Sequence, residues 1–203
     1  LKQSEYTGDG FRVVMGEAGV GPDITAQMSG GVIGGILKFQ EEILRPAQNE
    51  IGRMAAVIGD SFNELPREGC DLDGNTGNDL FSCRGPVASS RTSNADSGST
   101  SVSVTVVRSL QDAYHINGDT VTDAADITQL RDNWQASDYE LVADGVGGWT
   151  LTRLSDNSTV ALTDNTNAPT TLTAADGFVI DVSGAAGAAN DRFLIRPFQS
   201  TAS

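Results

Sequence analysis

The sequence feature that most constrains the fold is an apolar pattern that keeps a helical period over about thirty residues. Its members follow one another at steps of seven, four, four, three, four, four and three, which fit the 3.6-residue repeat of an α-helix: Ile36, Ile43, Ala47, Ile51, Met54, Ile58, Phe62 and Leu65. The pattern predicts a helix from about residue 36 to residue 62, roughly 40 Å long. We expect this apolar stripe to be its one buried face.

Glycines and prolines mark the irregular points of this helix. Gly30-Gly31 precedes it, and Pro66 and Gly69 end the pattern. Pro46 lies inside it, where the missing N–H and the clash with a carbonyl one turn back cost on the order of 3 kcal/mol unless a kink or break absorbs them. We expect a bend near Leu44. The alternative is two helices, with Pro46 in the first turn of the second.

Strand-like segments lie on both sides of the helix. Residues 11–15 and 23–28 flank a Gly-Val-Gly-Pro turn signal and predict a hairpin over residues 10–29. After residue 100 the apolar residues recur every second position, with Asp-Gly, Gly-Gly and Asp-Asn turns between the runs. The predicted strands are 102–106, 139–143, 149–154, 159–162, 170–173, 178–182 and 192–196. About seven strands in a hundred residues predict an antiparallel β-sandwich or a partly open barrel.

A change in composition divides the chain. Residues 84–100 are small and polar and carry no period, so we expect a linker there. The predicted units are residues 1–83, with the hairpin, the long helix and an Asx/Gly-rich loop, and residues 101–203, an antiparallel β domain. The fold class is therefore α+β: a long kinked helix with a β-hairpin, followed by a mainly antiparallel β-sandwich or partly open barrel.

The charge of the chain bears on its partners. Thirteen Lys and Arg against 27 Asp and Glu give a formal net charge of -14, which disfavours nucleic acid and anionic membranes as partners. The sequence has no apolar run long enough to span a bilayer. The first residues are polar and the chain starts at Leu1, so we expect no signal peptide and a fragment of something longer. The composition, with 23 Gly and 20% charged residues, is typical of β-rich extracellular proteins.

Two cysteines flank the Asx/Gly-rich loop. A disulfide between Cys70 and Cys83 would close about 14 residues and stabilise the fold by roughly 3 kcal/mol. The alternative is two free, partly buried thiols. The spacing alone does not decide between them, because a disulfide also requires a short Cα separation.

Catalytic patterns are missing from the sequence. His115 is the single histidine and no nucleophile elbow accompanies it, so neither a catalytic triad nor a common zinc site is predicted. Gly30–Gly35 lacks the Lys-Ser/Thr of a phosphate-binding loop. A carboxylate pair of the glycosidase kind is disfavoured because aromatics make up 6% of the residues, and we expect Trp134 and Trp149 in the core. We predict no enzyme, no catalytic residue, no metal and no cofactor.

Two segments resemble calcium loops. Asp71 to Asn75 alternates like an EF-hand loop, but Thr76 stands at the position of the turn glycine and Ser82 at that of the bidentate Glu. Asn117 to Asp126 is similar to half of a dockerin repeat, with His115 in place of the first carboxylate. We expect an Asx-rich turn in the first segment, and in the second a β turn followed by a short helix or loop from Asp123 to Asn133. Calcium binding is the open alternative in both.

Several motifs, in order, carry a family resemblance. They are Gly-Gly-Val-Ile-Gly-Gly-Ile-Leu-Lys-Phe at 30–39, Ile-Leu-Arg-Pro-Ala-Gln-Asn at 43–49, Ile-Gly-Asp-Ser-Phe-Asn at 58–63, Gly-Cys-Asp-Leu-Asp-Gly-Asn-Thr-Gly-Asn-Asp-Leu-Phe at 69–81, Trp-Thr-Leu-Thr-Arg-Leu-Ser-Asp at 149–156 and Asp-Arg-Phe-Leu-Ile-Arg-Pro at 191–197. Together they resemble the central part of the bacterial flagellar hook-associated protein 1 (FlgK) family over most of residues 8–203. Cys70 and Cys83 depart from the family pattern, and residues 107–136 match it poorly, as an insertion would.

The resemblance implies a function. It implies a structural subunit of the bacterial flagellum that forms the hook-filament junction, is exported through the flagellar type III channel, lies outside the cell and has no catalytic activity. The implied partners are other copies of the subunit, the hook protein and the next hook-associated junction protein. The helix would belong to an inner, densely packed domain and the β region to an outer domain.

The resemblance also bears on assembly. The family's terminal coiled-coil segments are absent from this sequence, so we expect the chain alone to be monomeric. The residues taken without the resemblance equally suit an extracellular β-sandwich adhesin or a carbohydrate-binding module.

Overall fold

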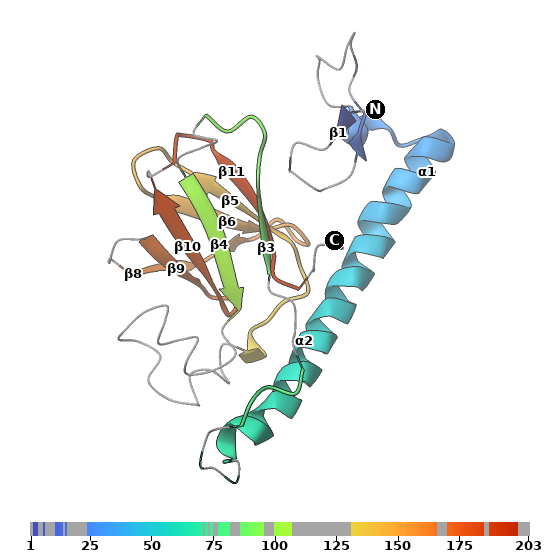
Figure 1. Ribbon diagram of the computed structural model, residues 1–203. Helices are drawn as coiled ribbons and strands as arrows, with labels where there is room; N and C mark the ends of the chain where they lie inside the picture. Colours follow the sequence, from blue (N-terminus) through green and yellow to red (C-terminus); the bar gives the residue numbers. More distant parts are fainter. Residues whose placement is uncertain are drawn as a thin grey trace.

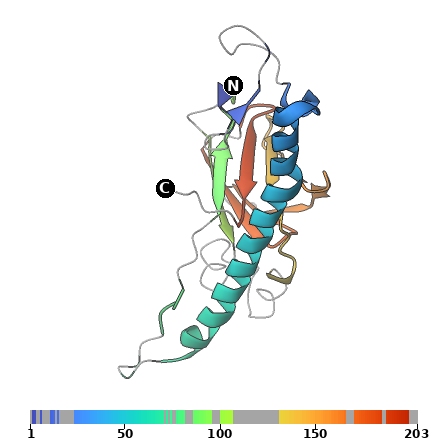
Figure 2. The ribbon, with the colours of Figure 1, turned by 90° about the vertical axis from the view of Figure 1, so that its right-hand side faces the viewer.

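A long helix runs beside two antiparallel sheets (Figure 1). The computed structural model describes residues 2–3, 6, 11–13, 15, 24–70, 72, 74, 77–81, 86–95, 100–106, 131–165, 170–184 and 187–198. A view at right angles shows the helix along one side of the sheets (Figure 2). A further two-stranded sheet lies near the N-terminus, and the two larger sheets do not close into a barrel, which confirms the predicted α+β class.

The helix is continuous but not α-helical throughout. It consists of α1 (Gly31–Phe39), a π-helical turn η3 (Gln40–Leu44) and α2 (Arg45–Glu68). The N–H of Arg45 bonds to the carbonyl of Gln40, five residues back. The next residue, Pro46, has no N–H to donate. The helix therefore changes from hydrogen bonds five residues back to bonds four residues back at a position where no N–H is left unpaired. A π-helical turn therefore lies where a bend near Leu44 was predicted, and the chain does not divide into two helices. The bend itself stays a prediction.

The N-terminal segment differs from the predicted hairpin over residues 10–29. Strand β2 (Phe11–Arg12) pairs antiparallel with β1 (Lys2–Gln3). Residues Thr25–Gln27 form a 3-10 turn, η2, in place of a second strand. The Thr25 hydroxyl accepts the backbone N–H of Val13 at 2.9 Å, which ties this turn to the chain after β2. A hairpin exists, but the prediction chose the wrong partner for residues 11–12.

The two sheets form the β domain, made of the described residues between 86 and 198. The five-stranded sheet has the order β3-β11-β5-β6-β7, and the four-stranded sheet the order β4-β10-β9-β8. Their bounds are β3 Val87–Ser90, β4 Thr100–Val106, β5 Tyr139–Ala143, β6 Trp149–Arg153, β7 Thr159–Val160, β8 Leu162–Asn165, β9 Thr170–Ala174, β10 Phe178–Gly184 and β11 Arg192–Arg196.

The segment expected as a linker, 84–100, contains part of this domain. Strand β3 pairs antiparallel with β11, from Val87 opposite Arg196 to Ser90 opposite Phe193. Asn94 is buried; its side chain donates to the carbonyl of Arg192 and accepts that residue's N–H, both at 2.9 Å. The edge strand has the sequence Val-Ala-Ser-Ser: its backbone pairs with β11, and Ala88 packs against the core. The expectation of an unstructured linker is therefore wrong for residues 87–95.

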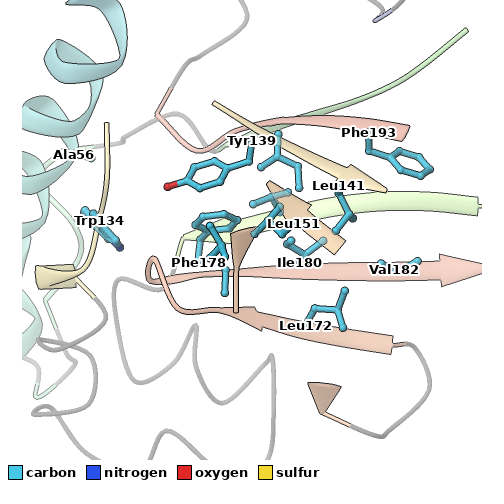
Figure 3. Packing of buried hydrophobic residues seen from close by; sticks show 14 residues of the cluster. Ala56, Trp134, Tyr139, Leu141, Leu151, Leu172, Phe178, Ile180, Val182 and Phe193 are labelled. Carbon is cyan, nitrogen blue, oxygen red and sulfur yellow. The ribbon is translucent and has the colours of Figure 1, made fainter. Parts of the chain in front are cut away.

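The core lies between the sheets (Figure 3). Alternate residues of the facing strands point inward, as the period of two predicts: Tyr139, Leu141, Leu151, Leu172, Ala174, Phe178, Ile180, Val182, Phe193 and Ile195. Trp134 is buried at the helix-facing end, as predicted. Trp149 is partly buried, 6.0 Å from the ring of Phe193.

A buried polar network joins the two sheets at one end of the core. The Tyr139 hydroxyl of β5 donates to Asp176 at 2.7 Å, in the turn between β9 and β10. Arg153 of β6 holds the same carboxylate at 2.7–2.9 Å. Burial raises the pKa of Tyr139, and the hydrogen bond to the Asp176 carboxylate raises it further. The three side chains satisfy one another, which is the condition for burying them without penalty.

Candidate assembly surface

The predicted apolar stripe is the exposed face of the helix. Six of its members in α2 and η3 are between 46% and 78% exposed: Ile43, Ile51, Met54, Ile58, Phe62 and Leu65. Ile36 in α1 is 60% exposed, and Ala47 is exposed as well. The expectation that this stripe is the helix's buried face is wrong for this chain. The helix is amphipathic, as the period indicated, but its apolar side points away from the β domain.

The face that meets the β domain is made of small and polar residues. At 3.6 residues per turn it lies roughly opposite the stripe. Its buried members are Asn49, Ala56, Gly59, Asp60 and Asn63. Gly52 is partly buried among them, and a Cβ atom there would lie 2.2 Å from the carbonyl oxygen of Phe198. Hydropathy alone does not reveal such a face, because glycine, alanine and asparagine carry little apolar signal.

Two charged clusters flank this contact. In the first, the buried Asp138 lies 3.8 Å from Arg45 of α2 and 3.5 Å from Arg196 of β11. Burial raises the pKa of Asp138, while Asn49 and Arg45 act against that rise. In the second, Asp60, whose side chain is fully buried, lies 3.0 Å from Arg131 and 3.2 Å from Arg67.

A return segment after the helix extends the exposed apolar surface. The Asn63 side chain donates to the carbonyl of Phe81 at 2.8 Å and accepts its N–H at 2.9 Å. Arg67 binds Asp79 with two hydrogen bonds, at 2.6 and 2.8 Å. The ring of Phe81, half exposed, stands edge-on to Phe62 at 5.8 Å. Phe81 therefore lies directly beside the distal end of the stripe.

The candidate site residues of the sequence lie mostly outside the described ranges. Cys70 is exposed and Cys83 is not described, so the disulfide stays a prediction. His115, the residues Asp71, Asp73 and Asn75, and the segment 117–126 are also outside. Among the described residues, no three His, Cys, Asp or Glu gather closely enough to hold a metal ion. In the same part of the chain, no helix has the length and apolarity needed to cross a membrane.

Two family models match the chain. Residues 1–81 match the helical domain of flagellar hook-associated protein FlgK. Residues 110–197 match the D2-like domain of flagellar hook-associated protein 1. The first match contains the whole helix with its exposed stripe, and the second contains most strands of the β domain.

Curated relatives and a solved structure agree with these matches. The chain is 33% identical over 167 residues to flagellar hook-associated protein 1 of Salmonella typhimurium and 29% identical to that of Escherichia coli, in each case over 82% of the chain. It spans about a quarter of the length of these relatives, 25%. The flagellar hook junction protein FlgK from Burkholderia pseudomallei has a similar structure, with a TM-score of 0.65 and 27% identity, covering 91% of this chain and 29% of that one.

Proposed function

Because the chain belongs to the flagellar hook-associated protein 1 family, we propose that it is part of a structural subunit at the junction between flagellar hook and filament. The name of the Salmonella relative and the description of the Burkholderia structure as a hook junction protein support this proposal. The chain corresponds to about a quarter of such proteins, so the proposal concerns a longer protein of which it is a segment.

The observation that carries the proposal is the exposed apolar stripe of the helix. A long helix in a soluble protein normally buries such a stripe against other helices, and a large exposed apolar patch marks an interaction surface. The family model that matches this helix describes a helical domain. In our proposal the stripe packs against helices of the same full-length protein that lie outside this chain, and the β domain lies on the far side of the helix.

The remaining parts of the proposal follow from this assignment. The full-length subunit works outside the cell, contacts further copies of itself, the hook protein and the next junction protein, and catalyses no reaction. The proposed units are residues 1–83 and 101–203, with β3 of the segment between them joined to the second unit. The chain alone is monomeric, and a Cys70–Cys83 disulfide is testable by mass spectrometry of non-reduced peptides. No observation on the described residues favours an adhesin or a carbohydrate-binding module.

Immunogold electron microscopy tests the proposal. Antibodies raised against this chain should label one narrow band between the hook and the filament of isolated flagella. In-frame deletion of the helix from the full-length gene should give cells whose hooks carry no filament, with normal hook length as the control. Labelling along the filament or over the cell body, or filaments that stay attached after the deletion, would contradict the proposal.

A further inference from the structure

Helix α2 touches the β domain at three points along its length, and we infer that these contacts hold the helix and the β domain at one fixed angle. The inference concerns the chain itself and does not depend on the flagellar role. Both ribbon views show the helix alongside the β domain, as the three contacts require (Figures 1 and 2).

The first contact is the Asp138 cluster. Asp138 belongs to the β domain by its backbone, since its carbonyl accepts the N–H of Leu154 at 2.9 Å. Its carboxylate is 5% exposed and faces Arg45 and Asn49 of α2 on one side and Arg196 of β11 on the other. Two cations from different elements thus share one buried anion. Moving the helix would leave that anion with less compensation in a site that excludes water.

The second contact is the Asp60 cluster, three helical turns further on. Asp60 and Glu64 of α2 both bind Arg131, at 3.0 and 2.7 Å. Arg131 lies three residues before Trp134, whose ring nitrogen donates to the carbonyl of Gly177 at 2.9 Å. The arginine is therefore anchored to the β domain through its own chain neighbours. Eleven residues separate Asn49 from Asp60, which places the two clusters roughly 16 Å apart along the helix.

The third contact lies between the two clusters and is steric. Gly52 lets the helix backbone approach the Phe198 carbonyl more closely than any side chain would allow. One turn later, Ala56 is 6% exposed and belongs to the core cluster with Trp134 (Figure 3). Phe198 packs against the same cluster. The rings of Trp134 and Phe198 stand 5.5 Å apart and form the floor of this contact.

The arrangement resists both sliding and rotation. A single small-residue contact would allow the helix to pivot about Gly52. Buried ion pairs on either side, at about 16 Å separation, oppose such a pivot because both would have to break together. The apolar stripe on the far face therefore keeps a fixed direction relative to the β domain.

Pulsed electron paramagnetic resonance on the 203-residue chain tests this inference. Spin labels are attached at Gln48→Cys in the helix and Ser183→Cys in β10, both exposed positions, after Cys70→Ser and Cys83→Ser. We expect one narrow distance distribution. Gly52→Leu should shift it or at least double its width, because the leucine side chain cannot fit against Phe198.

Two further variants make the test decisive. Gly35→Leu is the matched control: it changes a helical glycine whose Cβ would meet nothing within 4 Å, and it should leave the distribution unchanged. The double variant Asp60→Asn, Asp138→Asn should broaden the distance distribution while the β domain stays folded. If Gly52→Leu does not fold, this double variant alone tests the fixed angle. A broad distance distribution in the labelled chain without contact substitutions would overturn the inference. So would a distribution that stays unchanged both in Gly52→Leu and in the Asp60→Asn, Asp138→Asn double variant.

Discussion

Tyr139 is a single residue whose burial makes stability depend on pH. Its pKa is raised above the ordinary value near 10, so the folded chain keeps a proton that the unfolded chain loses. The stabilising effect is complete below pH 10 and declines above it, by about 1.4 kcal/mol between pH 9 and pH 11. Tyr6 has a raised pKa as well, through burial and Glu140, and adds a second contribution in the same direction.

We therefore predict the behaviour of Tyr139→Phe. The change removes a buried hydrogen bond to a carboxylate and should lower the free energy of unfolding by about 2 kcal/mol at pH 7. The difference from the unaltered chain should shrink as the pH rises from 9 to 11, and the Tyr6→Phe, Tyr139→Phe double variant should show the weakest pH dependence. Urea titrations at each pH measure both effects. If the free energy of unfolding of Tyr139→Phe fell between pH 9 and pH 11 as steeply as that of the unaltered chain, Tyr139 would not be the source of the pH dependence.

Asn63 is the residue that attaches the return segment to the helix. Its side chain is 3% exposed and forms both backbone hydrogen bonds of Phe81. Asn63→Ala should leave those groups unsatisfied and cost about 1–3 kcal/mol locally. We expect faster hydrogen exchange at the Phe81 amide, while the exposed Asn78→Ala serves as the control without effect. Equal exchange rates in the two variants would show that the segment is held in another way.

At the scale of elements, the π-helical turn explains how the helix accommodates Pro46. A proline in a regular helix interior costs about 3 kcal/mol, but here its missing N–H coincides with the change of hydrogen-bond register. We predict that Pro46→Ala changes the free energy of unfolding by less than about 1 kcal/mol. Gln48→Pro, only two residues later at an exposed position, should cost about 3 kcal/mol or more. Urea unfolding followed by far-ultraviolet circular dichroism compares the two variants. Equal losses in the free energy of unfolding would show that the π-helical turn does not accommodate Pro46.

The sequence predicted the strands well for a physical reason. In β5 buried and partly exposed residues alternate, and both β5 and β11 have the predicted bounds, 139–143 and 192–196. Alternation and Asp-Gly turns are local signals, which need no knowledge of the partner strand. Strand β3 has no such signal, since its four residues, Val-Ala-Ser-Ser, do not alternate and pair at an edge. Local signals also do not identify the partner strand, and for this reason residues 11–12 were predicted to pair within 10–29 although they pair with residues 2–3.

The helix shows where periodicity stops being informative. The stripe from Ile36 to Leu65 predicted an amphipathic helix, and the helix is there. Periodicity states which side is apolar but not what covers it. The side that meets the β domain depends on the size of Gly52 and Ala56 and on the charges of Asp60, none of which raises the hydropathy. A search for small residues at helical spacing opposite the stripe would have found this face.

Substitutions on opposite faces of α2 should have opposite effects on the stability of the whole molecule. Ile58 is 57% exposed, so Ile58→Glu in this chain should change the free energy of unfolding by no more than about 0.5 kcal/mol. Ala56→Glu, two residues earlier, forces a charge against Trp134 and Phe198 and should cost about 3 kcal/mol or more. A large loss in Ile58→Glu would show that the stripe is already covered in this chain.

We propose that the exposed stripe becomes buried in the full-length protein, and thiol labelling measures that burial. Ile51→Cys, with Cys70 and Cys83 replaced by Ser, is compared in the 203-residue chain and in the full-length protein, and Ser183→Cys on the exposed end of β10 is the reference. We predict rapid labelling of Ile51→Cys in this chain and strong protection in the full-length protein, with Ser183→Cys reactive in both. Equally rapid labelling of Ile51→Cys in the two proteins would show that the stripe stays exposed in the full-length protein.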